Sequence, residues 1–124
     1  MPGKTTRADF AIFRREVEKW IKAFGLYDWE VDVVHGGVED SNHAAECLYQ
    51  VDARRATIRL SKEFTHGSEF TKDDIRQAAI HEVGELLLAR LVFLAESRSV
   101  TYEQIEEAHH DVIARLLNYL RRKL

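Results

Sequence analysis

The apolar stretch from Ile75 to Leu94 constrains the fold more than any other feature of the chain, because it carries charged residues in its interior. In its middle stands the segment His81-Glu82-Val83-Gly84-Glu85. A helix turns about 100° per residue, so His81 and Glu85 share one face while Glu82 lies on the neighbouring face. Ala78, Leu88, Ala89 and Val92 fall on or beside the same stripe as Glu85, so we expect Glu85 to be buried or to lie at the bottom of a cleft. A buried carboxylate without a partner is costly, so Glu85 needs a cation, a hydrogen-bond network or a metal ion.

This spacing differs by one residue from H-E-x-x-H, in which two histidines of one helix bind zinc and the glutamate polarises a water molecule. Glu85 stands where that motif has its second histidine. H-E-x-x-E occurs by chance in many charged helices, so a metal site needs a further ligand from another segment. The last predicted helix offers His109 near the centre of its apolar face and His110 at its edge. A short connection should make this helix an antiparallel neighbour of the His81 helix.

Length and charge limit the class of protein. With 124 residues the chain is long enough for one domain with a two-layer core. Its 18 Lys and Arg stand against 21 Asp and Glu, and the only dense basic run is residues 121–123, so we expect no nucleic-acid partner. Cys47 is the single cysteine, which excludes an internal disulfide framework. The polar residues 1–6 predict no signal peptide, and the apolar run 83–95 is too short and too charged to span a membrane. We therefore expect a cytoplasmic protein.

Hydrophobic periodicity predicts an α+β fold over residues 1–124, with an N-terminal helix, a small three-stranded antiparallel or mixed sheet, and two packed helices that carry the metal site. Close strand spacing favours an antiparallel meander. The predicted helices are at 7–24, ended by Gly25, from a Thr71 cap to Glu96, and at 102–122 with a Thr101–Gln104 capping box. The predicted strands are at 29–34, 45–51 and 56–60. Loops are predicted at 36–43 and 61–69. The middle helix is apolar nearly all round, so we expect it to be covered on more than one side. Gly84 within it predicts the close approach of another backbone.

Several of these segments together resemble the compact zincins, a group that includes minimal gluzincin-like domains and metallopeptidases of bacteriophage and prophage genomes. The resemblance covers nearly the whole chain. It rests on the opening helix, the strands Trp29–Val33 and Ala56–Leu60, the helix segment Ile80–Leu87, and the Val-Ile-x-Arg-Leu pattern at Val112–Leu116. In gluzincins the first of two helices provides two histidines and the second a glutamate. Here the first helix has His81 and Glu85, and the second has a histidine.

The resemblance implies a zinc-dependent metallopeptidase. Zn²⁺ would be bound by His81, Glu85 and a histidine of the last helix, where periodicity favours His109 and family-like spacing favours His110; we favour His110. Glu82 would act as the general base that activates water. A peptide or protein substrate would add a strand to the edge of the sheet. The oxyanion would be stabilised by the metal ion, with Tyr102 or His66 as candidate donors.

Three other interpretations stay open at this point. The first is a zincin-fold protein without catalysis that binds metal or another protein. The second is a non-haem iron protein, because two histidines and a carboxylate form a facial triad and Glu106/His109 and Glu107/His110 have the spacing of di-iron helices. The third is a buried polar network that joins the two helices. For the remaining candidates, Cys47 is expected to be a small buried hydrophobe, and His35 and His43 to be solvated loop residues.

Overall fold

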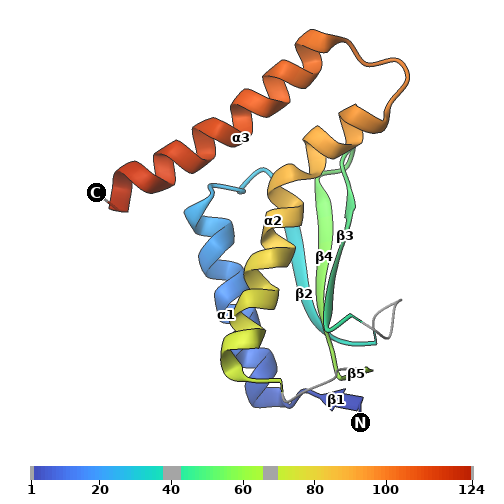
Figure 1. Cartoon of the computed structure of the whole chain (residues 1–124), viewed down its shortest axis with the longest axis vertical. Helices are drawn as coiled ribbons and strands as arrows, with labels where there is room; N and C mark the ends of the chain where they lie inside the picture. The colour runs from blue at the N-terminus through green and yellow to red at the C-terminus, as the bar shows by residue number, and fades with distance from the viewer. Residues whose placement is uncertain (1, 38–42, 66–69, 124) are drawn as a thin grey trace.

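The computed structural model describes residues 2–37, 43–65 and 70–123. In these described residues the helices are α1 (Arg7–Ala23), α2 (Lys72–Glu96) and α3 (Tyr102–Lys123), and the strands are β1 (Pro2–Lys4), β2 (Glu30–Gly36), β3 (Ala45–Gln50), β4 (Arg55–Ser61) and β5 (Glu63–Thr65). The fold is α+β, as predicted (Figure 1). The short pair β1 and β5, antiparallel to each other, was not predicted from the sequence, and β5 lies in the segment 61–69 that was expected to be a loop.

The main sheet is mixed, with the strand order β2-β4-β3 among the described residues. β3 and β4 are antiparallel across a tight turn in which Arg54 has a φ of 53°. β2 instead runs parallel to β4, from the pair Glu30 and Arg55 to the pair Gly36 and Ser61. The mixed sheet is one of the two arrangements that were predicted, but the antiparallel meander that the strand spacing favoured is wrong. Side-chain alternation shows which residues of a strand face the core, but it carries no information on the order of the strands.

The core lies between this sheet and the helices α1 and α2, which are on one side of it (Figure 1). α1 follows the prediction closely: Phe13 and Val17 are fully buried, and the chain leaves the helix at Gly25 with a φ of +63°. A left-handed conformation at this position favours glycine. The remaining fully buried large side chains come from Leu26, Ile58, Leu60, Ile75, Val83 and Leu86.

His35 lies inside β2 rather than in a solvated loop, so its predicted environment is wrong. Its ring stacks on Phe10 with a centroid distance of 5.1 Å, and its Nε2 is 2.7 Å from the hydroxyl of Thr5. Burial and, second, the positive charge of Lys62 lower the pKa of His35. The side chain thus has a structural role at the base of the sheet.

α2 begins at the predicted cap, where the Thr71 hydroxyl accepts a hydrogen bond from the Asp74 amide and the Asp74 side chain accepts one from Thr71. Its C-terminal half is less covered than expected, since Leu88, Val92 and Phe93 are between 39% and 47% exposed. The buried residues of α2 form a single stripe along the helix, so the predicted burial on more than one side is wrong. No helix in the described part of the chain combines the length and the apolar character that crossing a bilayer requires.

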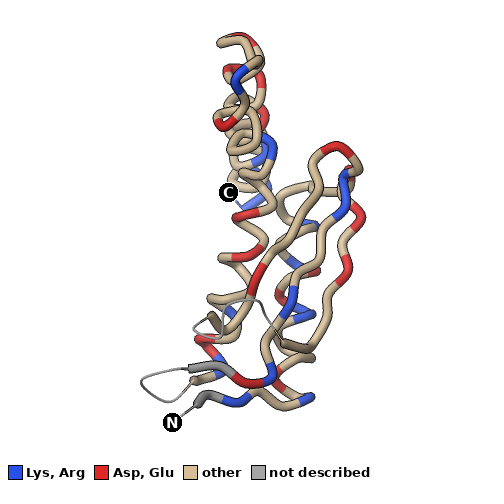
Figure 2. Tube along the Cα trace, turned by 90° about the vertical axis from the view of Figure 1, so that its right-hand side faces the viewer, with Lys and Arg blue, Asp and Glu red and all other residues tan. Residues whose placement is uncertain are grey.

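α3 contacts α2 near the turn that joins the two helices, and its second half reaches the end of α1. Tyr119 contacts Trp20 and Phe24 at centroid distances of 5.6 Å and 5.8 Å, and Arg115 donates to the carbonyl oxygens of Phe24 and Gly25. The helix therefore diverges from α2 (Figure 1). Basic and acidic residues are interspersed along the described trace (Figure 2).

The buried face of α3 also differs from the predicted one. Ala108 and Val112 are buried, whereas Ile113, Leu116 and Leu120 are between 37% and 53% exposed. His109, predicted to lie at the centre of the apolar face, is exposed. Arg115 and Tyr119 lie on the same side of α3 as Ala108 and Val112, and they contact α1. This side of the helix, rather than the predicted one, therefore faces the rest of the protein.

Two glycines give opposite predictions for stability. A Cβ added to Gly84 would meet none of the surrounding described atoms within 4 Å, so the predicted close backbone approach is wrong. We expect Gly84→Ala to raise the free energy of unfolding by about 0.5–1 kcal/mol, because alanine loses less backbone entropy in a helix. Gly25→Ala should lower it by about 1 kcal/mol, since its left-handed φ is costly for alanine.

Urea denaturation of both variants measures these changes. A loss of stability in Gly84→Ala would mean that this site is more crowded than the structure shows.

Candidate functional site

A cleft of about 390 Å³ separates α2 from the edge strand β3 and contains part of the predicted site. From α2 it is lined by Ala78, His81, Glu82 and Glu85, and from β3 and the segment before it by His43, Ala44, Ala45, Glu46 and Cys47. The H-E-x-x-E segment and one end of the sheet edge thus share a single depression of the surface.

Glu82, rather than Glu85, is the buried carboxylate. Glu82 is 8% exposed, whereas the side chain of Glu85 is 51% exposed, so the predicted burial of Glu85 is wrong. The physical reason is the direction of the α2 core stripe, which runs through Ile75, Ala79, Glu82, Val83, Leu86 and Ala89. The stripe predicted from the sequence ran through Ala78, Leu88 and Val92 instead. Because it lies further round the helix, it led to the wrong prediction that Glu85 is the buried glutamate.

Burial is the main reason that the pKa of Glu82 is raised above its ordinary value. The negative charges of Glu85 and Glu46 raise the pKa further, and the nearby His81 and His43 lower it. Glu46 itself forms an ion pair with Arg59, with an N–O distance of 2.7 Å. Glu82 therefore lies in a cleft where charge on its carboxylate is disfavoured unless a cation is near.

His81 and Glu85 lie together at the mouth of the cleft, as their spacing predicted. Nε2 of His81 is 3.3 Å from Oε1 of Glu85, and the two side chains are 69% and 51% exposed. An imidazole nitrogen and a carboxylate oxygen at this separation, both accessible from solvent, are two ligand atoms that one metal ion can bind.

His109 and His110 are not brought to this pair. Within the described residues, the one group of three residues whose possible ligand atoms lie within 4.8 Å of one another is Glu106, His109 and His110, all of α3. α3 meets α2 at Arg90, whose guanidinium is 3.3 Å from Glu107, and then crosses towards α1. The four predicted ligands thus form two groups on two helices. Of the oxyanion candidates, Tyr102 bonds to Glu106 on α3, and His66 lies outside the described residues.

His43 is the cleft residue that sequence reasoning missed. It was expected to be a solvated loop residue, yet it lines the cleft and its charge influences the pKa of Glu82. Its position just before a predicted strand could have indicated that it lies near the cleft. This inference requires knowing that the strand is at the edge of the sheet next to α2, which the sequence does not show.

Comparison of the chain with protein-family models, with curated proteins and with solved structures finds no match. The described fold and site therefore define its class: an α+β protein with a mixed sheet, in which an H-E-x-x-E helix lies beside the sheet's edge strand. Its chemistry has to be argued from the site.

Cys47 gives a prediction on the cleft's environment. Burial, followed by the charges of Glu82 and Glu85, raises the pKa of its thiol to about 12. Because only the thiolate reacts, we expect iodoacetamide to label the native protein at pH 8 at least about a hundredfold more slowly than the urea-unfolded chain.

Mass spectrometry of timed samples measures this labelling, with Cys47→Ser as the unlabelled control. Equal rates in native and unfolded protein would show that the thiol is not shielded from water.

Proposed function

We propose that this protein is a zinc-dependent peptidase of zincin-like architecture, acting in the cleft between α2 and β3. One observation carries the proposal: the helix face with His81, Glu82 and Glu85 opens beside an edge strand. A peptidase needs both parts at one place, because the strand holds the substrate backbone and the helix provides the reacting groups.

The edge of β3 is the proposed substrate platform. β3 pairs with β4 on one side, and its other edge has no strand partner among the described residues. Backbone N–H and C=O groups on such an edge pair readily with an extended peptide, which adds a strand to the sheet. A peptide bound along residues 45–47 would pass over His81 and Glu82, because both segments line the same cleft.

Two donor groups of the cleft are already placed for a zinc ion, because His81 and Glu85 provide ligand atoms from consecutive turns of α2. We propose His43, on the opposite wall, as the third ligand; the three do not all lie within 4.8 Å of one another, so His43 has to move towards the pair to bind the same ion. This assignment replaces His109 and His110, which are grouped with Glu106 on α3. Zinc, when bound, polarises the scissile carbonyl and makes water more acidic.

Glu82 is the proposed general base. Its carboxylate accepts the proton of the attacking water and then donates that proton to the leaving amine. Burial favours the protonated form of Glu82, so the side chain can hold the proton between these two steps. Glu46 forms an ion pair with Arg59 in the same wall, and we assign it no part in the reaction.

The test combines zinc content with peptidase activity on a mixture of fluorogenic peptides, using the untagged full chain. We expect Glu82→Gln to keep its cleft zinc and to lose activity by about a hundredfold or more, because general acid–base groups contribute effects of that size. His81→Asn should lose both the cleft zinc and the activity, and His43→Asn should weaken zinc binding. Glu103→Gln, an exposed glutamate of α3, is the matched control and should change neither.

The possible failures are distinct. Zinc that is bound through His81 without hydrolysis of any peptide would replace the peptidase by a metal-binding interaction module. Full activity in Glu82→Gln would remove the proposed general base. Zinc content that does not depend on His81 or Glu85 would contradict the proposed centre itself.

A further inference from the structure

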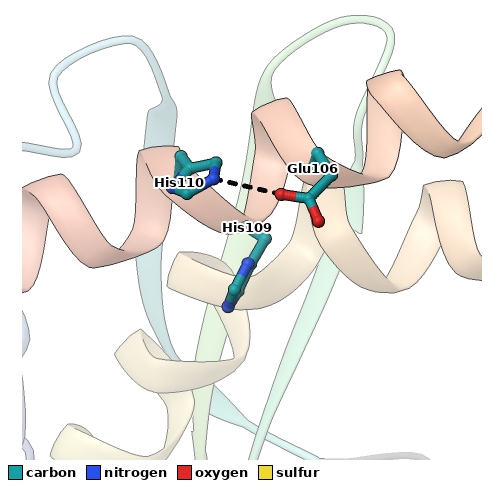
Figure 3. Close-up of side chains that lie close together, drawn as sticks. All are labelled: Glu106, His109 and His110. Carbon is teal, nitrogen blue, oxygen red and sulfur yellow. Dashed lines mark ion pairs between the residues drawn. The ribbon is translucent and has the colours of Figure 1, made fainter.

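A second group of ligand-type side chains lies on α3, away from the cleft. His109 and His110 follow Glu106 by three and four residues, so each of them is a neighbour of Glu106 on the helix surface. Each offers a ligand atom within 4.8 Å of the other two. In Figure 3 Glu106 and His110 point toward each other, with Nε2 of His110 3.0 Å from Oε2 of Glu106, while the ring of His109 extends away from this pair. The His109 and His110 rings have a centroid distance of 5.5 Å.

The carboxylate of this group is held by a neighbour one turn earlier. The Tyr102 hydroxyl donates a hydrogen bond of 2.5 Å to Oε1 of Glu106, which leaves Oε2 directed at His110. Outer partners of this kind fix the orientation of a carboxylate ligand in metal sites. Tyr102 is 75% exposed and is not part of the core, so the interaction that we assign to its side chain is this hydrogen bond to Glu106.

We propose that Glu106, His109 and His110 form a metal site of their own, which binds Zn²⁺ or another first-row divalent transition ion independently of the cleft. Two imidazoles and one carboxylate are a donor set that such ions prefer, whereas Mg²⁺ and Ca²⁺ prefer oxygen ligands alone. Ligands of a tetrahedral zinc ion lie roughly 3.4 Å from one another, given bond lengths of about 2.0–2.1 Å. The ligand atoms of the group lie within 4.8 Å of one another, so rotation of the exposed side chains has to bring them closer to reach that spacing.

The exposure of the group suits this role. The side chains of His110 and Glu106 are 69% and 38% exposed, so they can rotate towards an ion without disturbing the core. The backbone that carries them is regular helix, so binding orders side chains alone. Water can complete the coordination shell from the solvent side. An exposed pair of Glu106 and His110 alone contributes little to stability and leaves the position of His109 unexplained.

The experiment isolates this site by removing the other one. Zn²⁺ is titrated calorimetrically into the untagged full chain carrying His81→Asn, which deletes a proposed ligand of the cleft. In this background we expect one zinc ion to bind through α3. Adding Glu106→Gln, His109→Asn or His110→Asn should weaken that binding at least tenfold, and Tyr102→Phe should weaken it about tenfold through loss of orientation. Glu103→Gln is the matched control and should leave the affinity unchanged.

A second readout does not depend on the affinity. Zn²⁺ should shift the imidazole NMR signals of His109 and His110 while leaving those of the half-buried His35 in place, and Mg²⁺ at the same concentration should shift neither. Unchanged affinity in both Glu106→Gln and His110→Asn would overturn the site. So would zinc shifts confined to other histidines. Because the titration is made without His81, these outcomes are independent of whether the cleft is a peptidase centre.

Discussion

The central position of β4 is the constraint on which the rest of the structure depends. β4 pairs with β2 on one side and β3 on the other, and its Ile58 and Leu60 are fully buried against the helices. Because β4 occupies the middle, β3 is placed at the edge although it precedes β4 in the chain. That edge is the one next to α2, so sheet order alone decides that the H-E-x-x-E helix faces a strand with an open side.

The direction of the core stripe on α2 then decides which of the polar residues that this helix contributes to the cleft are buried and which are exposed. Since Ala79, Val83 and Leu86 face the sheet and α1, Glu82 on the same stripe is buried, and His81 and Glu85 turn towards solvent. In the proposed function the accessible pair binds the ion, and the buried carboxylate, whose pKa is raised, transfers the proton.

α3 meets α2 near the turn that joins them, and its second half reaches the end of α1, so its histidines lie away from the cleft. Arg115 binds the carbonyl groups at the end of α1 and Tyr119 packs on Trp20, so the helix axis diverges from α2 after Arg90. His109 and His110 consequently have their nearest ligand-type neighbour in Glu106 of their own helix. The residues whose spacing suggested one shared zinc site thus lie in two separate groups on two helices.

The sequence by itself determined the local features: the three helices with their caps at Thr71 and Thr101, the left-handed end at Gly25, the main strands, and the shared face of His81 and Glu85. These depend on backbone geometry and on neighbours within about one helical turn, which periodicity records. The tertiary structure alone decided that β2 and β4 are parallel, that Glu82 is buried in place of Glu85, that His43 joins the cleft, and that the α3 histidines lie apart from it. Each of these follows from packing between segments that are distant in the sequence. An apolar helix such as α2 has apolar side chains on several faces, so its own sequence does not specify which face the sheet and the other helices will cover.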